Sequence, residues 1–392
     1  MRIAHLADPH LGFRRYTRLT SRGRNQREAD VAAAFASAIT GVIAAAPDAV
    51  IVAGDLFEQV RPPNSAILEA YRQFARLRVA LPNVPIVLIA GNHDSPRSTE
   101  TASILGLFDQ IGVQVAAHDA RRYNFGDLAV LAVPHQALFT QPRIALEPTG
   151  PERYQVLVLH GETPGLFGKH RDIEEPGGAL LSEQDIAGGP WSYVALGHYH
   201  VQHQVRDRVW YAGSLDYVSS NPWGELRVER DERIRGKGWL LVDLESGTVE
   251  RQPITAPRRV IDLPWLDAQE LSASELDRLL AEAVEGVEGG IDDAVVRQVV
   301  RNVSRTVARE LDHAAIRKWK AAALHFHLDL RRPAPAEKQG GSGAPGSARR
   351  TLAEELGEHL RGRPLPKGVD REQFVADGLA LLAEVESREG EG

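Results

Sequence analysis

The stretch VPIVLIAGNHDSP, residues 84–96, decides the fold, because an apolar run ends there in a group of polar residues. The run VPIVLIA is typical of a buried strand. Gly91 and Asn92 alone would indicate a turn, but His93 and Asp94 add side chains that bind metals or move protons. The neighbouring strands therefore decide whether GNHD is only a turn or part of a reaction centre.

Short apolar runs alternate with helical patterns through residue 112. The runs are RIAHLA, DAVIVAG and VPIVLIAG, and the helical patterns cover 27–46 and 63–81. Uninterrupted apolar strands between helices predict an α/β layer with buried strands. From 113 to 250 the chain is richer in strands, with LAVLAVP, YQVLVLH, SYVALGH, RVWYAGS and KGWLLVDL. We expect a second sheet packed on the first, which gives an α/β sandwich.

The order of these patterns predicts four parts of the chain. In sequence they are the sandwich, 1–255, a small unit, 256–332, a linker, 333–350, and a C-terminal helical segment, 351–392. The small unit has a helical pattern near 273–285 and the alternating strand LHFHLDL, and the last segment has helical patterns at 351–362 and 371–386. The linker is rich in glycine, serine and proline. Within it, GSGAPG matches a dinucleotide-binding fingerprint, but no strand precedes it, so we interpret the match as chance.

The composition excludes several classes of protein. The 392 residues contain no cysteine, which excludes disulfides, thiolate zinc sites and cysteine nucleophiles. The net charge of −7 excludes a chain that is basic as a whole, so any binding to nucleic acid must be local. The N-terminus MRIAHLADPHLG has no secretory hydrophobic segment, and no apolar run approaches the roughly 18 residues of a membrane-spanning helix. We therefore expect a cytoplasmic protein of two or three domains that does not bind a membrane.

Polar side chains follow several of the predicted strands at the point where each strand ends. Because ligands bind outside the carboxyl ends of strands in α/β sheets, these ends point to a single site. Glycines stand beside them, where the backbone must turn tightly. The residues are Asp8 and His10, Asp55, the group Asn92, His93 and Asp94, His160, and finally His198 and His200.

The donor types at these positions are chemically coherent. Carboxylate, amide and imidazole ligands without thiolate suit manganese, iron or zinc. They are too many for one closed tetrahedral site, but they suit two metals that share a bridging carboxylate, an arrangement used for in-line phosphoryl displacement. Each piece alone has an ordinary explanation as a loop, a turn, a helix cap or a buried histidine. Their joint occurrence after strands favours a two-metal centre.

The order DPH, GD, GNHD, HG, GHYH resembles that of the calcineurin-like metallophosphoesterases. More closely, HLADPHLG, IVAGDLFEQVRPP and IAGNHDSP resemble the DNA-repair nuclease branch, the SbcD or meiotic recombination eleven type. The resemblance covers residues 1–250 and, through ALHFHLDLRRP, the unit 256–332. It implies a four-layer α/β/β/α sandwich with a small α+β capping domain and C-terminal helices.

The resemblance also implies a role for each strand-end residue around two Mn²⁺ ions, with other divalent metals possible. The implied ligands are Asp8, His10 and His200 for the first metal, Asn92, His160 and His198 for the second, and Asp55 as the bridge. His93 would be the general acid beside the scissile phosphate. Asp94 would orient the imidazole of His93.

One position departs from the family pattern. Many nuclease members carry a histidine three positions after the bridging aspartate, where this chain has Glu58. A carboxylate there would repel phosphate unless it is turned away or paired, and Arg61 is a nearby partner in the sequence. Glu58 therefore leaves open what stabilises the phosphate at this position.

The loop after the first strand, GFRRYTRLTSRGRNQR, holds six arginines and no acid between Arg14 and Arg27. Arginine contacts to phosphate give much of the affinity of proteins for DNA, and a tyrosine can stack on a base. The alternative is a solvated, mobile loop. Beside a predicted phosphoesterase site we favour DNA binding. The residues expected to contact DNA are Arg14, Arg15, Tyr16, Arg18, Arg22 and Arg24.

Three further histidines lie in or after predicted strands. His325 and His327 alternate with apolar residues, so both lie on one face of LHFHLDL. Because the sequence offers no third ligand nearby, we interpret this face as solvent-exposed and not as a metal site. His135, in VPHQ, ends a strand and fits a structural position as well as one near the site.

The two C-terminal helical patterns are amphipathic. Leu352, Leu356 and Leu360 recur at helical spacing, and the second pattern has an apolar side that includes Phe374. Such helices fold back on the body or dock on a partner. The resemblance implies that they grip the coiled-coil base of an SbcC-like ABC ATPase, and that the protein is a homodimer through helices near 63–112. The chain lacks a GxxxxGK(S/T) motif, so any ATP dependence would come from that partner.

These observations favour a manganese-dependent DNA exonuclease and endonuclease that works with an SbcC-like ABC ATPase in double-strand-break repair. A second hypothesis is a calcineurin-like phosphoesterase that acts on nucleotides or phosphoproteins. A third is a protein that docks DNA and the ATPase with weak catalysis. The arginine-rich loop and the partner-type tail count against the second hypothesis, and the complete ligand set counts against the third.

Overall fold

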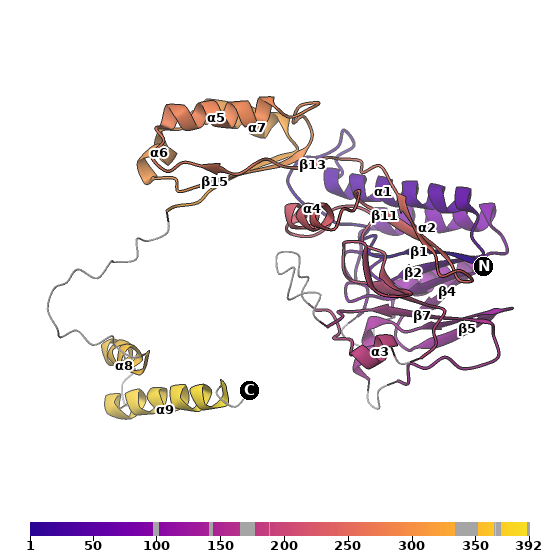
Figure 1. Ribbon diagram of the computed structural model, residues 1–392. Helices are drawn as coiled ribbons and strands as arrows, with labels where there is room; N and C mark the ends of the chain where they lie inside the picture. The colour runs from indigo at the N-terminus through magenta and orange to yellow at the C-terminus, as the bar shows by residue number, and fades with distance from the viewer. Residues whose placement is uncertain are drawn as a thin grey trace. The chain divides into compact units, whose positions relative to one another are not determined.

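The chain divides into two compact units, Met1–Pro333 and Ala334–Gly392. The computed structural model describes residues 1–96, 102–140, 144–164, 177–187, 189–333, 352–363, 365 and 370–389. The first unit holds two large sheets and a smaller third sheet (Figure 1). The predicted sandwich and the predicted small unit both lie within it.

The first sheet contains the three apolar runs of the N-terminal part. Across the sheet the strands are β12 (Val249–Pro253), β11 (Gly238–Asp243), β1 (Arg2–Leu6), β2 (Ala49–Ala53), β3 (Ile86–Ile89) and β4 (Val113–Ala116). Strands β1 to β4 are parallel, whereas β11 pairs antiparallel with β1 and with β12. Parallel neighbours require long crossovers, and the predicted helices supply them between β1, β2 and β3. The carboxyl ends of these strands therefore lie along one edge.

Two long helices cover the outer face of this sheet (Figure 1). They are α1 (Gln26–Ala45) and α2 (Asn64–Ala80), and the short 3-10 helix η1 (Ile104–Ile111) packs beside them. Helix α1 begins where the side chain of Asn25 accepts two backbone hydrogen bonds. Phe74 of α2 contacts both Phe35 of α1 and Phe108 of η1, with ring centroids 5.9 and 5.1 Å apart. This aromatic contact joins all three helices over the sheet.

Helix α1 is also long and apolar enough to cross a membrane by length and composition alone. The expectation that no segment approaches such a helix is therefore too broad. The core helix of a folded domain passes the same test, and Val31, Phe35 and Ile39 are buried here against the sheet and α2. The first turn also carries the buried charged side chains Arg27 and Asp30. This packing explains the apolar composition of α1 as that of a core helix.

The second sheet packs face to face on the first. Across it the strands are β5 (Arg121–Phe125), β6 (Leu128–Ala132), β7 (Tyr154–His160), β8 (Tyr193–Gly197), β10 (Val209–Tyr211) and β9 (His203–Arg206). Ile51 and Val87 of the first sheet share a core with Val158 and Ala195 of the second. The outer face is covered by shorter segments, among them η2 (His135–Phe139), α3 (Glu183–Ala187) and α4 (Pro222–Asp231). The four-layer α/β/β/α sandwich is confirmed, with a fourth layer of short helices and loops.

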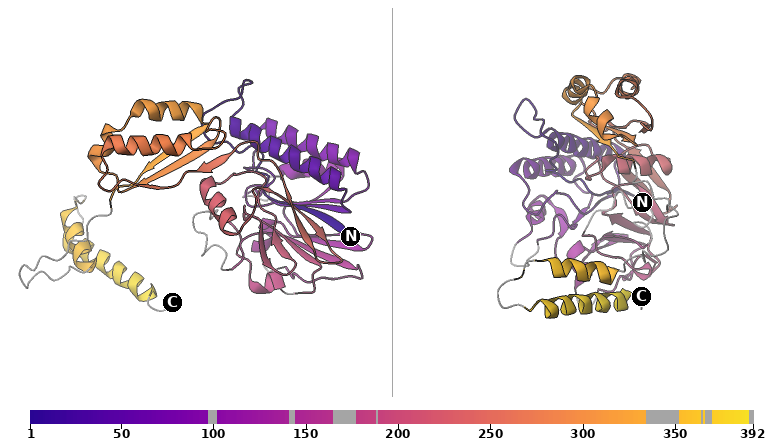
Figure 2. Two further views of the ribbon diagram at one scale, coloured as in Figure 1. Left: turned by 45° about the horizontal axis from the view of Figure 1, so that its top comes forward. Right: turned by 90° about the vertical axis from the view of Figure 1, so that its left-hand side faces the viewer.

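The third sheet belongs to the predicted capping unit. Its elements are β13 (Val260–Asp262), β14 (Leu266–Asp267), α5 (Ala273–Glu285), β15 (Val295–Arg301), α6 (Arg305–Glu310), α7 (His313–Ala322) and β16 (His325–Leu330). Helix α5 matches the helix predicted near 273–285 and begins in a capping box of Ser272 and Glu275. The orange helices lie on one face of the sheet (Figure 2). All strand pairs are parallel, so the helices are βαβ crossovers.

The other face of this sheet turns toward the sandwich. Trp223 of α4 packs against Val295 and Leu324. Arg258, just before β13, forms an ion pair with Asp30 of α1, with Nε and Oδ2 2.7 Å apart. These contacts explain why the sandwich and the capping unit form one compact unit. The boundary predicted after residue 255 stays a prediction.

The second unit contains a helical hairpin. Helices α8 (Leu352–Gly362) and α9 (Arg371–Glu389) match the patterns predicted at 351–362 and 371–386. The two helices approach closely at Gly378 of α9, where an added Cβ would collide with Leu360 of α8. Residues 334–350, which carry most of the predicted linker and the GSGAPG match, lie outside the described residues.

Candidate metal centre

Left-handed backbone shapes the ends of the strands that carry the predicted ligands. Asp8, His10, Asp55 and His198 have φ angles of 51°, 46°, 47° and 98°. Residues with a Cβ adopt such angles rarely, at a cost of about 1–3 kcal/mol each, and they cluster at functional sites. Hydrogen bonds hold the first two turns together, since Asp8 N donates to Gly54 O (3.1 Å) and His10 N donates to Asp55 O (2.9 Å).

Two glycines permit the close approach of these turns. A Cβ at Gly91 would collide with the carboxylate of Asp55, and a Cβ at Gly197 would collide with the carbonyl oxygen of Ala53. A side chain at either position would therefore displace a strand end. Gly91 of the GNHD stretch thus serves the site as well as the turn.

Asp8, His10 and His200 form one group of candidate ligands. One ligand atom from each lies within 4.8 Å of the others, and all three side chains are buried. His10 Nε2 and His200 Nε2 are 3.1 Å apart. These converging nitrogen and oxygen atoms fit a first divalent ion.

Asn92, His160 and His198 form a second group. Asn92 Oδ1 lies 2.9 Å from His160 Nε2 and 3.0 Å from His198 Nδ1. The other nitrogen of each ring has a partner, since His160 Nδ1 is 2.8 Å from Ala53 O and His198 Nε2 is 3.3 Å from Glu162 Oε1. These outer partners orient the rings so that His160 offers Nε2 and His198 offers Nδ1 to the centre.

Asp55 lies between the two groups. Its Oδ2 is 3.7 Å from His10 Nε2 and 3.1 Å from His160 Nε2. Its Oδ1 accepts a hydrogen bond from the backbone N–H of His93 at 2.9 Å. Among the described residues, the buried Oδ2 receives no hydrogen bond of good geometry, although His160 Nε2 lies 3.1 Å away. A buried carboxylate oxygen with poor hydrogen bonding costs free energy, and metal ions held by the two groups would satisfy it.

The charges of the centre favour bound cations. Burial alone would lower the pKa of His160, but the carboxylates of Asp55 and Asp8 raise it to about 9. Burial would raise the pKa of Asp55, but the imidazoles of His160 and His10 hold it well below its usual range. The buried carboxylates therefore hold a proton on His160. A divalent ion that displaces this proton supplies the positive charge in its place. The donor set fits two such ions.

Glu58 is paired with a candidate ligand. Its Oε2 lies 2.9 Å from His10 Nδ1, which leaves His10 Nε2 to face the centre. Of the two arrangements left open by the sequence, turned away or paired, the carboxylate adopts the second, and its partner is His10 and not Arg61. The pairing partly offsets the charge of the acid at the position where the resemblance implies a histidine, and it strengthens His10 as a metal ligand.

We expect Glu58→Ala to weaken Mn²⁺ binding by about 10- to 100-fold, which is the usual effect of removing the outer partner of a metal-bound histidine. Glu58→Gln should keep most of the affinity, because an amide oxygen still accepts a hydrogen bond from His10. Gln59→Ala is the matched control, since Gln59 is exposed and lines the adjacent pocket. Calorimetric titration with Mn²⁺ measures the effect. Equal affinity of Glu58→Ala and the parent protein would contradict this role.

His93 is held by the backbone that follows Asp55. Its Nδ1 lies 2.8 Å from Glu58 O, so the ring donates there and keeps Nε2 for proton transfer. The ring also meets that of His10 edge-on, with centroids 4.9 Å apart. Ligand atoms of His10, Asp55 and His93 form a further group within 4.8 Å. The geometry therefore allows two roles for His93, as a metal ligand or as the proton donor that the resemblance implies. The role as proton donor stays a prediction.

Asp94 does not hold the imidazole of His93, so its expected orienting contact is wrong. Asp94 Oδ1 accepts from Phe57 N at 2.8 Å, and Oδ2 accepts from Leu56 N at 2.8 Å and Gly91 N at 3.4 Å. Burial and then the charge of Asp55 raise the pKa of Asp94 to about 7. Asp94 thus fixes the turn after Asp55, and it positions His93 through that backbone.

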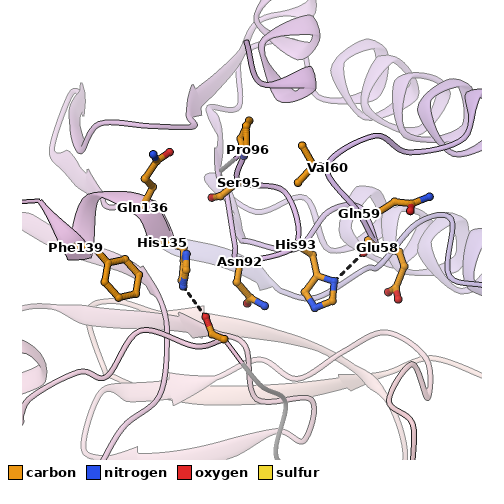
Figure 3. Close-up of a pocket in the computed structure, with 11 residues that line it drawn as sticks. Glu58, Gln59, Val60, Asn92, His93, Ser95, Pro96, His135, Gln136 and Phe139 are labelled. Atoms are coloured by element: carbon orange, nitrogen blue, oxygen red, sulfur yellow. Dashed lines mark hydrogen bonds between the residues drawn. The ribbon is translucent and has the colours of Figure 1, made fainter. Parts of the chain in front are cut away.

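A pocket of about 540 Å³ opens beside the metal centre (Figure 3). Asn92, His93 and Glu58 form one side, and His135 and Phe139 form the other. His135 Nε2 donates to Gly177 O at 2.9 Å, and burial followed by the charge of His160 lowers the pKa of His135 to about 4. The structure therefore places His135 at the site. The sequence indicates His135, because VPHQ also follows a strand. No sequence pattern singles out Phe139.

The expectation of unopposed charge in the arginine-rich loop is wrong for four of its six arginines. Arg27 is buried and pairs with Asp30 and Asp216, at 3.0 and 3.1 Å. Arg14 Nε and Arg24 Nε pair with the two carboxylate oxygens of buried Glu28, at 2.7 and 2.9 Å. Arg18 Nη1 pairs with Asp293 Oδ1 of the capping unit at 2.7 Å. All the acids that pair with the loop lie outside it in the sequence, so the composition of the loop could not reveal them. These ion pairs hold the loop between the sandwich and the cap.

Tyr16 of the same loop stacks on His325, with ring centroids 4.1 Å apart and an interplanar angle of 15°. His327 stacks on Trp223 at 5.7 Å. The solvent-exposed interpretation of this histidine face is therefore wrong for His325, which packs against the loop. One face of Tyr16 is covered as well, which limits its predicted stacking on a base.

The sequence matches known proteins over the part that builds this site. A family model described as Calcineurin-like phosphoesterase matches residues 1–225. Three curated relatives are each called DNA double-strand break repair protein Mre11. The relative from Methanococcus maripaludis is 40% identical over 259 residues, which are 63% of this chain and 64% of that protein.

The other two relatives come from Thermoplasma acidophilum and Sulfurisphaera tokodaii. The first is 29% identical over 261 residues, which are 64% of each chain. The second is 30% identical over 254 residues, which are 62% of this chain and 60% of that protein. The chain thus spans less than two thirds of the length of these relatives.

Proposed function

The chain belongs to the calcineurin-like phosphoesterase family, and we propose that it is a metal-dependent nuclease that hydrolyses phosphodiester bonds in DNA. It would act as an exonuclease and endonuclease in double-strand-break repair. The observation that carries the proposal is the convergence of two ligand groups on Asp55 Oδ2, beside a pocket that contains His93. The names of the three relatives support DNA as the substrate.

In the proposed reaction, each part of the centre has a separate task. When bound, two Mn²⁺ ions lower the pKa of water and neutralise phosphate charge. The pocket beside Asn92 and His93 receives the scissile phosphate. His93 Nε2 gives a proton to the leaving oxygen, while Glu58 O holds the opposite ring nitrogen. Asp94 keeps the turn that presents this carbonyl.

A paired assay with a large and a small substrate tests the function. We expect the full chain to degrade linear DNA and to hydrolyse bis(4-nitrophenyl) phosphate when Mn²⁺ is present, and to do neither with a chelator. Gel analysis and absorbance at the nitrophenolate band measure the two reactions. The chelated protein is the matched control, because sequence and fold are unchanged.

The two alternatives predict other outcomes of the same assay. Cleavage of the small diester alone would favour a phosphoesterase that acts on nucleotides or phosphoproteins. DNA binding without cleavage of either substrate would favour a docking protein with weak catalysis. Each outcome would reject the nuclease.

We propose that the exposed part of the arginine-rich loop contacts DNA phosphates near the centre. Arg15 and Arg22 are exposed, and among the described residues no acid forms an ion pair with either. Arg14 is also largely exposed, although it shares Glu28. Arg18 and Arg24 form the ion pairs that hold the loop in place. A flatter dependence of DNA affinity on salt in Arg22→Gln would support the contact, and an unchanged slope would reject it.

We propose that two copies associate through α2 and η1. Leu68, Tyr71 and Leu107 are exposed there, at 55%, 39% and 38% of their surface. Apolar side chains gathered on two packed helices favour burial against a second copy. Sedimentation equilibrium of the Leu68→Glu variant tests this surface. A dimeric parent and a monomeric variant support it, and a monomeric parent rejects it.

We propose that the helical hairpin docks on an SbcC-like ABC ATPase. Leu381 of α9 is 64% exposed, although Val375 of the same helix is buried in the hairpin. An exposed leucine on a small two-helix unit fits a partner surface. Leu381→Glu should then reduce co-purification with the ATPase and leave the metal-dependent hydrolysis of the small diester unchanged. We place the protein in the cytoplasm, with the DNA on which it would act.

A further inference from the structure

A basic groove of about 630 Å³ lies between α4 and the capping sheet, outside the metal centre. Figure 1 shows α4 beside β13, and the groove follows this junction. We call it the arginine–tryptophan groove. Its basic and aromatic lining residues are Arg227, Arg230, Trp265, Arg297, Arg301 and Arg331. None of these residues belongs to the loop for which DNA contacts were predicted from the sequence.

The charge of the groove is only partly balanced. Asp262 is the acid in its lining, and it forms a bidentate pair with Arg297, at 2.8 and 2.7 Å. Arg331 pairs with Asp329 at 2.8 Å. Within the described part of the chain, no acid forms an ion pair with Arg230 or Arg301. These two exposed guanidinium groups therefore favour a bound anion.

Trp265 adds a feature that a simple anion site would not need. It is 56% exposed in the loop after β13. The guanidinium of Arg301 lies over its ring, 4.7 Å from the centroid. An exposed aromatic ring beside arginines is typical of sites where bases stack and phosphates are neutralised. The ring face of a base is available for this only where the base is unpaired.

We propose that the arginine–tryptophan groove binds an unpaired strand of DNA, with a base stacked on Trp265 and backbone phosphates at Arg230 and Arg301. The groove volume lies in the range of small-molecule pockets and suits single nucleotides of such a strand. A duplex keeps its bases stacked inside and offers phosphates alone. The inference rests on the proposed function, because it assigns the unpaired part of the same substrate to this groove.

Fluorescence anisotropy with the full chain tests the groove directly. The probe is a labelled single-stranded oligothymidylate, titrated with chelator present so that cleavage does not interfere. We expect Trp265→Ala to weaken binding by about tenfold and Trp265→Phe to restore most of it, since stacking needs only an aromatic face. We expect Arg301→Gln to flatten the slope of log affinity against log salt by about 0.7, the value for one lost phosphate contact on a single strand.

Arg251→Gln is the matched control for Arg301→Gln. Arg251 also lies over a tryptophan, 5.5 Å from the ring centroid of Trp210, but in the sandwich and outside the groove lining. The Arg251→Gln substitution removes the same charge and the same kind of contact as Arg301→Gln. Affinity and salt slope should therefore stay at the parental values. Equal losses in both variants would show a general charge effect and overturn the proposal.

Two further measurements separate the outcomes. If Trp265→Ala weakens binding to a labelled hairpin duplex as much as binding to the single strand, the groove binds the backbone of a duplex. The unpaired-strand proposal then fails. Hydrolysis of bis(4-nitrophenyl) phosphate with Mn²⁺ monitors the metal centre without the groove. Its absence in the parent rejects the proposed function, whereas normal hydrolysis with unchanged oligothymidylate binding in the variants rejects only the groove.

Discussion

His93→Ala should lower Mn²⁺-dependent cleavage of linear DNA by about 100- to 10,000-fold while two Mn²⁺ ions still bind per chain. The reason is that His93 Nδ1 is engaged with Glu58 O, so Nε2 is the atom left to protonate the leaving oxygen. Hydrolysis of bis(4-nitrophenyl) phosphate should fall much less, because nitrophenolate leaves without a proton. The ratio of the two rates therefore reports the proton donor. Gel and absorbance assays measure the rates, and calorimetry counts the metals.

The matched control is a histidine outside the metal centre. His313→Ala removes an exposed histidine of α7, in the capping unit and outside the pocket lining, and both rates should stay near the parental values. If His93→Ala binds one metal fewer and loses both activities together, His93 is a ligand with His10 and Asp55. That result would replace the assignment as general acid.

Lys237→Met should destabilise the fold by about 3–5 kcal/mol, because it leaves buried carboxylates without their cation. The Lys237 side chain is only 2% exposed and pairs with both Glu225 and Glu229 of α4. Burial would lower the pKa of Lys237, but these two carboxylates raise it, so the ammonium stays charged. Its Nζ also donates to His200 O at 2.8 Å. Loss of Lys237 should therefore weaken Mn²⁺ binding at His200 as well.

Urea unfolding followed by circular dichroism measures the stability of Lys237→Met. Lys318→Met is the matched control, because Lys318 is exposed on α7 and its loss should change stability by less than about 0.5 kcal/mol. Parental stability in Lys237→Met would mean that the two glutamates do not need this ammonium. A double variant with Glu225→Gln should recover part of the lost stability, since it removes one of the unpaired charges.

The convergence of the strand-end residues could be predicted from the sequence because it depends on local order. Each predicted ligand follows an apolar strand, and the parallel strands β1, β2, β3, β7 and β8 bring their carboxyl ends to one place. The alternation of strands and helices fixes this edge before any side chain is considered. The same reasoning left His135 open between a structural position and one near the site, and it follows β6 and lines the pocket.

Pairings between distant segments could not be predicted in the same way. Arg18 pairs with Asp293, 275 positions away, and Glu58 pairs with His10, 48 positions away. Asp94 was expected to contact its neighbour His93, yet successive residues in a turn point in different directions, and Asp94 binds the turn after Asp55 instead. Sequence patterns give the face on which a residue lies, but they do not give what covers that face.

The left-handed backbone at Asp8 and Asp55 restricts how this centre can change in evolution or by design. At φ near 50°, asparagine, aspartate and glycine are tolerated best, whereas β-branched residues are genuine outliers. A glutamate or threonine introduced to recruit another metal would therefore meet conformational resistance before any question of coordination arises. Exchange between aspartate and asparagine remains open at both positions. The accessible variants of the centre differ mainly in charge, and only little in the reach of their ligands.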